Sequence, residues 1–383
     1  DAIRHNSATS DAITTAADGT CTAKLTSIGG GGLSHRNKVI NGAINICQRA
    51  TTQNTISASG YYVADRFNIN MVNVGSFRTN LFQSSQSPDG FNNSLGVSIG
   101  TGTAGAIAAS ERVSLEQRIE SQDLQDLSFG TSAAKSFTLS FYVRSSRTGQ
   151  YGINMRQHDS GKDYNEKFDI SVANTWERKI ITVTGNTGDT FADDNGIGMW
   201  FRIMLRAGSN SVGNVNYQSW GSSDADKAPT GQQTTWGTDA NDDFYLTGIQ
   251  LEIGDTATSF EHRSFGDELA RCQRYYYRMQ NGSSGSYWVG HTSSYGGNNN
   301  IMMIHLPVCM RDNPTLGHSG TASHFQLWGN GTVENLSNVP VLRASVGINP
   351  SVVAIDITHN ITTGHTRILR MGSQAYLEFS AEL

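Results

Sequence analysis

The residues best suited to chemistry are aromatic and basic side chains on the polar faces of predicted strands. The alternating segment 199–206, "MWFRIMLR", places its Trp and two Arg residues on one face. The candidates on this and the neighbouring predicted strands are Trp200, Arg202, Arg206, Tyr142, Arg144, Asn154 and Arg156. Aromatic rings stack on the apolar side of a pyranose, and Arg and Asn side chains bind its hydroxyls. These residues are therefore candidates for carbohydrate binding; the alternative is that they contact another subunit or domain.

Motifs of catalytic and metal sites are weak in this sequence. Residues 100–105, "GTGTAG", match G-x-G-x-x-G, but no β-α-β pattern surrounds them, so we expect a loop. The acidic clusters at 193–195 and 239–243 lack the spacing of a calcium loop, so a structural calcium stays possible but unsupported. No H-E-x-x-H or C-x-x-C occurs. We expect no enzyme, no catalytic metal and no cofactor, although a carboxylate pair of a glycan hydrolase could be hidden among the 33 acidic residues.

Composition narrows the class of protein. The 383 residues are only 16% charged, with a formal net charge of −5, which argues against a nucleic-acid partner. No apolar run approaches the roughly 18 residues of a membrane helix, so we expect no membrane insertion. Glycine is abundant at 41 residues, and Ser, Thr and Asn punctuate short apolar alternations. This composition is typical of many short strands joined by tight turns.

The strand pattern predicts a mostly β protein. Segments 137–145 and 199–206 alternate cleanly, as does 245–253 with Tyr245, Ile249, Leu251 and Ile253 on its buried face. Without a helical pattern between them, such strands indicate an antiparallel sandwich. The predicted organisation is an N-terminal attachment arm with a Gly linker (1–36), a jelly-roll β-sandwich (37–263), a connecting helix (264–281) and a smaller, distal β domain (282–383) that could bind a receptor.

The predicted helix at 264–281 stands out because it is charged and ends in three tyrosines. Ser264 can cap it, and acidic residues in its first turn suit the helix dipole. Phe265, Leu269, Cys272 and Tyr276 form one apolar stripe. We expect it to join two β domains; the alternative is a surface helix on the first domain. The residues expected at the junction, between domains or subunits, are Leu269, Cys272, Tyr275, Tyr276 and Tyr277.

Several stretches together resemble phage tail-fibre proteins: "NKVINGAINICQRATT" (37–52), "YYVADRF" (61–67), "ANTWERKIITV" (173–183), "DNGIGMWFRIML" (194–205), "LTGIQLEIGDTATSFEHRSFGDELARCQRYY" (246–276) and "LPVCMRDNPT" (306–315). The first domain also looks like a jelly-roll carbohydrate-binding module, with Asn41-Gly42 and Trp176 at matching positions. Such modules often carry an acidic pair beside a structural calcium, where this chain has Gly248.

The resemblance implies a virion component of the tail, assembled in the host cytoplasm, that mediates adhesion to the host. Its implied partners are two further copies in a homotrimer, other virion proteins through the N-terminal arm, and a host-surface glycan or receptor. Two rival functions remain open: a capsid-decorating protein that binds no receptor, and a glycan depolymerase on the same architecture.

Overall fold

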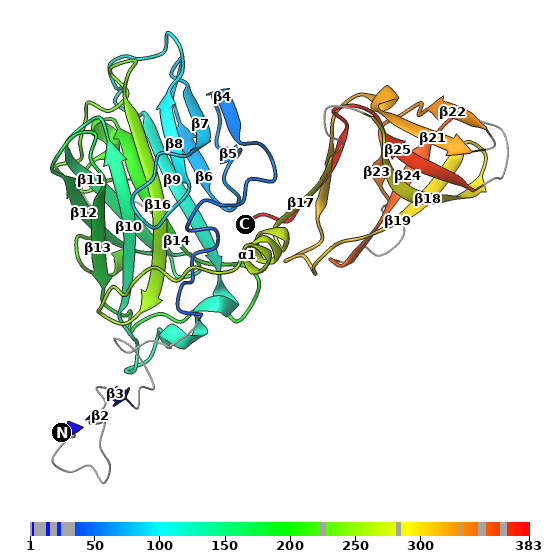
Figure 1. Ribbon diagram of the computed structural model, residues 1–383. Coiled ribbons are helices and arrows are strands. Elements are labelled where there is room, and N and C mark those ends of the chain that lie inside the picture. Colours follow the sequence, from blue (N-terminus) through cyan, green and yellow to red (C-terminus); the bar gives the residue numbers. More distant parts are fainter. Residues whose placement is uncertain are drawn as a thin grey trace.

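We analysed a computed structural model of the chain (Figure 1). The structure describes residues 2–3, 13–15, 21–23, 35–213, 215–222, 227–280, 285–329, 331–343, 350–360 and 366–383. The chain is mostly β, with a jelly-roll sandwich at one end and a smaller β unit at the other. Among the described residues, no helix is both long and apolar enough to span a membrane.

The first unit is a sandwich of two antiparallel sheets. The six-stranded sheet has the order β13 (Glu177–Val183), β10 (Phe137–Ser145), β16 (Asp243–Ile253), β8 (Ser94–Ile99), β7 (Thr79–Ser84) and β4 (Thr52–Ile56). The seven-stranded sheet has the order β15 (Gly221–Ser222), β12 (Lys162–Ile170), β11 (Gly149–Gln157), β14 (Ile197–Ala207), β9 (Arg112–Glu120), β6 (Asn68–Val72) and β5 (Gly60–Tyr61). Short 3-10 turns follow β9 (η1, Ser121–Leu127) and β14 (η2, Ser209–Ser211).

The core between the sheets is formed by the side chains that the alternation predicts, except in β16, where a bulge changes which residues face inward. Phe141 and Phe201 lie fully inside, as their strand patterns predict. In β16, however, Phe244 belongs to the core while Tyr245 lies on the opposite face, against Trp176. The cause is Gly248, which has φ +61° at a bulge where the pairing of β10 with β16 shifts register. Thus the predicted inward position of Tyr245 is wrong, while those of Ile249, Leu251 and Ile253 are confirmed.

Part of the predicted N-terminal arm is described. Strands β1 (Ala2–Ile3), β2 (Ile13–Thr15) and β3 (Cys21–Ala23) form a small antiparallel sheet. The Gly linker at 29–32 lies outside the described residues.

The connecting helix is shorter than predicted. Helix α1 spans Phe265–Gln273, and Ser264 caps it by accepting a hydrogen bond from the Asp267 amide. The chain then enters a strand, β17 (Tyr276–Gln280), instead of continuing as helix to residue 281. Consecutive tyrosines favour strands, and β17 finds its partner about a hundred residues downstream, which local spacing does not reveal. The predicted apolar stripe is also wrong at both ends, since Phe265 is 64% exposed and Tyr276 belongs to β17.

The C-terminal unit contains two further antiparallel sheets around a separate core. The three-stranded sheet has the order β17, β26 (Tyr376–Ser380) and β20 (Thr315–His318). The seven-stranded sheet has the order β22 (Thr332–Asn335), β21 (Phe325–Gly329), β25 (Arg367–Met371), β18 (Tyr287–Gly296), β19 (Asn299–His305), β24 (Val352–Thr358) and β23 (Val341–Leu342), and the 3-10 turn η3 (Ala322–His324) leads into β21.

The tyrosines lie where the two units meet. Tyr275 and Tyr276 are both buried, and their hydroxyls point to opposite units. The Tyr275 hydroxyl donates to Glu120 at the end of β9, whereas the Tyr276 hydroxyl donates to Glu378 in β26. Tyr277 stacks on Phe379 in the C-terminal unit, 6.4 Å between ring centroids.

The other two predicted junction residues, Leu269 and Cys272, lie on α1. Leu269 is half-buried on α1. Cys272 is fully buried, and this burial raises the pKa of its thiol well above the usual value. The thiol therefore acts as a small apolar group.

Residues 381–383 return from the C-terminal unit and bind the first unit beside α1 (Figure 1). The Glu382 carboxylate pairs with Arg66, whose side chain is fully buried, and lies 3.1 Å from Arg49. The Leu383 carbonyl accepts hydrogen bonds from Tyr61 and Arg118. This returning segment therefore joins the units in addition to the connection through α1.

Asp65, which lies beside this junction, makes the stability of the folded protein depend on pH. It accepts two hydrogen bonds from Gln48, whose amide also donates to the Tyr276 carbonyl. Burial raises the pKa of Asp65 to about 7, although Arg49, 3.9 Å away, opposes the shift. Folded protein thus keeps this proton up to about pH 7, whereas the unfolded chain loses it near pH 3.8.

We expect stability to fall as pH rises from about 4.5 to 7, by at most about 4 kcal/mol. Urea denaturation at intervals between pH 4.5 and 8 measures this change. The Asp65→Asn variant, which carries no titrating proton there, should show a flatter profile. An equally steep profile in that variant would assign the dependence to another group.

Candidate functional site

The outer face of the seven-stranded sheet in the first unit carries two cross-strand rows of polar side chains. One row runs Asp163, Arg156, Trp200, Arg118 across β12, β11, β14 and β9. The next row runs Asn165, Asn154, Arg202, Glu116, Asn68 and reaches β6. The structure therefore brings together four of the predicted residues: Asn154, Arg156, Trp200 and Arg202.

The second row is closed to ligands. Arg202 is buried and binds the Glu116 carboxylate through Nε at 2.9 Å and Nη2 at 2.8 Å. Asn154 is fully buried and donates to Asn165. The chain between β14 and β16 crosses this face, where Asn216 binds Asn165 through its carbonyl. The prediction that Arg202 and Asn154 contact a sugar is therefore wrong, because both side chains are buried and bind neighbouring side chains of the sheet.

Arg206 is buried at the far end of β14. Its guanidinium binds Glu111 at 2.9 and 3.1 Å and also donates to the carbonyls of Trp236, Gly105 and Ala106. The loop predicted at 100–105 is confirmed, and its last glycine takes part in this network. Arg206 thus anchors two loops and is not available to a sugar.

Tyr142 and Arg144 lie on the other sheet. Their strand, β10, pairs with β13 and β16, so it belongs to the six-stranded sheet. Tyr142 packs against Phe91, and Arg144 pairs with Asp243 at 3.2 Å. Alternation correctly places each side chain on a face of its strand, but it does not reveal to which sheet the strand belongs. The sequence therefore grouped Tyr142 and Arg144 with residues that lie on the other sheet.

What remains accessible is a strip of four side chains that we name the Trp200 strip: Arg156, His158, Trp200 and Arg118. Trp200 is partly exposed on β14, its indole 5.3 Å from the His158 ring and 5.6 Å from the Arg156 guanidinium. Its Nε1 donates to the buried Asn154 at 3.3 Å, which fixes the orientation of the ring. An indole with one edge anchored and cations beside it is a surface on which a planar or pyranose ligand can stack.

Buried carboxylates hold both arginines of the strip. Arg156 lies 3.2 Å from Asp163, and Arg118 lies 2.7 Å from Glu116; both carboxylates are fully buried. Each guanidinium is therefore positioned before a ligand arrives, which reduces the entropy lost on binding. Sequence reasoning missed Arg118, His158 and Asp163. The signal for Arg118 was present in the alternation of 112–120, whose polar face holds Ser114, Glu116 and Glu120 as well.

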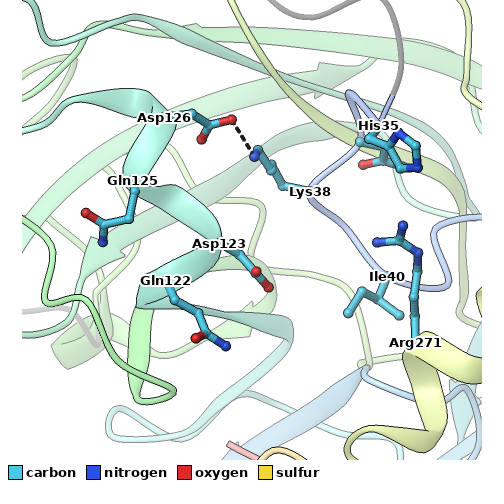
Figure 2. Close-up of a pocket in the computed structure, with 9 residues that line it drawn as sticks. His35, Lys38, Ile40, Gln122, Asp123, Gln125, Asp126 and Arg271 are labelled. Carbon is cyan, nitrogen blue, oxygen red and sulfur yellow. Dashed lines mark hydrogen bonds and ion pairs between the residues drawn. The ribbon is translucent and has the colours of Figure 1, made fainter. Parts of the chain in front are cut away.

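A polar pocket of about 390 Å³ lies where the chain enters the first unit (Figure 2). Residues 35–40 form one side, η1 the other, and Arg271 reaches in from α1. Lys38 and Asp126 neutralise each other across it at 2.6 Å. Burial, and secondarily the charge of Glu120, raises the pKa of Asp123 on its wall. The residues that line this pocket include no Trp, Tyr or Phe, so it offers no stacking surface for a sugar.

Within the described part of the chain, no group of three His, Cys, Asp or Glu side chains is arranged to hold a metal ion. The acidic residues at 239–243 instead make turn contacts: Asp242 accepts from the Gly237 and Asp239 amides. Gly248, at the position where carbohydrate-binding modules often carry acid, is the bulge of β16.

No protein-family model and no curated protein matches this sequence. Among solved structures, the enzymatically active domain of bacteriophage CBA120 tailspike protein 4 shares 11% identity at a TM-score of 0.28, covering 60% of this chain and 23% of the tailspike chain. A family 11 carbohydrate-binding module from Clostridium thermocellum, in complex with a β-1,3-1,4-mixed-linked tetrasaccharide, shares 13% identity at a TM-score of 0.26 over 56% of this chain and 99% of its own.

A further match is the CBM22-1-GH10 pair of a Clostridium thermocellum xylanase, complexed with xylohexaose. It shares 10% identity at a TM-score of 0.28, over 55% of this chain and 30% of its own. Because these identities and TM-scores are low, the description of the fold depends on the strand pairing of this chain, and the description of the candidate site depends on the side chains of this chain.

Proposed function

We propose that the protein is a structural component of a phage virion, a tail fibre or receptor-binding fibre that adheres to glycans on the host surface. The sequence resemblance to tail-fibre proteins supports the virion setting. Assembly as a homotrimer, and attachment to other virion proteins through residues 1–36, belong to the same proposal. The low charge of the chain suits a glycan better than an anionic polymer.

The observation that carries glycan binding is the Trp200 strip. Its indole can stack on the apolar face of a pyranose, and the flanking guanidinium groups can donate to the hydroxyls at the rim of the sugar. Because Asp163 and Glu116 hold these groups from beneath, the strip resembles a preformed binding surface more than a mobile cluster of surface charges.

Replacing Trp200 by alanine is expected to weaken glycan binding about 10- to 100-fold, since one stacked aromatic ring often dominates a small interface. Suitable ligands are xylohexaose, the mixed-linked tetrasaccharide and purified host polysaccharide, measured by titration calorimetry. Trp176→Ala is the matched control, because Trp176 is also partly buried but lies just before β13, against Tyr245 of the six-stranded sheet.

Equal affinities of the Trp200→Ala and Trp176→Ala proteins would remove the Trp200 strip from the binding site. If the unaltered protein binds none of these glycans and no host cells, adhesion itself is contradicted. A capsid-decorating role without receptor binding would then be favoured.

A further inference from the structure

The C-terminal unit exposes a second aromatic surface, on the outer face of four neighbouring strands, β22, β21, β25 and β18. Strand pairing arranges its side chains in two rows. The first row is Asn335, Gln326, Arg370, Trp288; the second is Val333, Trp328, Ile368, His291. We name these eight side chains the distal face. The intervening residues of the same strands, including Phe325, Leu327, Leu369 and Met371, point the other way into the core.

Two indoles dominate the distal face. Trp288 is 49% exposed and Trp328 is 39% exposed, which is unusual for the largest apolar side chain. They meet across β25 with ring centroids 5.5 Å apart and planes at 85°. In such an edge-to-face pair, one ring uses its edge for the contact and keeps its own faces free of the partner ring. The pair holds both rings in place, so a stacking ligand meets an ordered surface.

A polar ladder lies beside the indoles. Arg370 donates from Nε to Gln326 at 2.8 Å, and Gln326 donates to Asn335 at 2.9 Å. The Arg370 guanidinium also lies 5.8 Å from the Trp288 ring. These bonds fix a row of amide and guanidinium groups at the spacing of neighbouring strands, where they can bind successive hydroxyls of one sugar chain.

We propose that the distal face is a second glycan-binding site, which takes a neutral chain of pyranose units. This inference rests on the proposed adhesive function and gives it a second point of contact. One unit stacks on an indole, and the hydroxyls of its neighbours bind Arg370, Gln326 and Asn335.

The charges on the distal face favour a neutral sugar over other ligands. Its two rows contain one arginine, one histidine and no carboxylate. A polyanion such as a nucleic acid needs several cations along its path, which these rows do not supply. Amides and a guanidinium beside open aromatic rings are the groups that bind hydroxyl-rich rings.

The test uses the full chain, with Trp288→Ala, Trp328→Ala and the double variant. Met303→Ala is the matched control, because Met303 is 49% exposed and lies on β19 of the same sheet. Each protein is applied to an array of neutral and acidic bacterial surface polysaccharides, and affinities for the bound glycans are measured by titration. We expect the double variant to lose at least 10-fold in affinity, each single variant less, and Met303→Ala nothing.

Comparison with Trp200→Ala separates this inference from the proposed function. If glycans bind and only Trp200→Ala weakens them, the protein is an adhesin and the distal face is not a site. If the unaltered chain binds no glycan, both ideas fail. A change of native mass in the double variant, with glycan binding intact, would make the distal face a contact between copies and overturn the inference.

Discussion

The Arg206→Ala variant should lose about 3–5 kcal/mol of unfolding free energy while keeping any glycan affinity of its folded fraction. Its guanidinium is buried and binds both oxygens of Glu111. Truncation leaves that buried carboxylate without its main cation, and it also frees carbonyls of two loops. The expected result is a shift of the urea midpoint, because the cost falls on folding and not on the Trp200 strip.

Arg144→Ala is the matched control for this experiment. Arg144 was an equal candidate in the sequence, yet its pair with Asp243 is partly exposed, at 16% and 23% of the two side chains, and should contribute at most about 1 kcal/mol. Joint replacement of Arg206 and Glu111 by methionine should recover much of the loss, since it removes the uncompensated charge. A loss for Arg206→Ala no larger than for Arg144→Ala would contradict this account.

Replacing Glu382 by alanine should uncouple the two units. Arg66 would keep a fully buried guanidinium with its carboxylate partner gone, although it still donates to the Arg118 carbonyl and lies 3.4 Å from the Tyr275 ring. We expect a loss of about 3–5 kcal/mol and two calorimetric transitions in place of a coupled one. Limited proteolysis should release the units at lower protease concentration.

Asp126→Ala is the control for Glu382→Ala. It removes a carboxylate from an ion pair with Lys38 in which the Asp126 side chain is about half exposed, so its effect should stay near or below 1 kcal/mol. An unchanged unfolding profile in the Glu382→Ala protein would mean that the remaining contacts hold the units together without this ion pair.

The sequence predicted elements well where a local pattern decides them. The alternation in 137–145 and 199–206 yields strands with the expected inward faces, and Ser264 caps α1 as its side chain suggests. Local patterns failed where distant partners decide. Tyr276 belongs to a strand because β26 pairs with it. In β16, the bulge at Gly248 puts residues before it on the opposite face from the one that uninterrupted alternation predicts.

The predicted binding residues show the same limit. Trp200 and Arg156 are neighbours because β14 and β11 pair, but Arg202 and Arg206 are lost to buried ion pairs with Glu116 and Glu111. No local pattern connects these partners, which lie about ninety residues apart in the chain. Exposure of Trp288 and Trp328 could not be foreseen either, since an alternating strand with an aromatic residue normally buries it.

The return of residues 381–383 to the first unit has a mechanical consequence. Tyr276 and Ser380 are paired at the same end of β17 and β26, and the chain passes from both points to the first unit. A force applied to the C-terminal unit is therefore distributed over two connections, the chain that enters β17 and the chain that leaves β26. Arg311 resists twisting, because it exchanges hydrogen bonds with Asn195 of the first unit. If a glycan binds the distal face as proposed, tension on it would reach the sandwich through both connections and not through α1 alone.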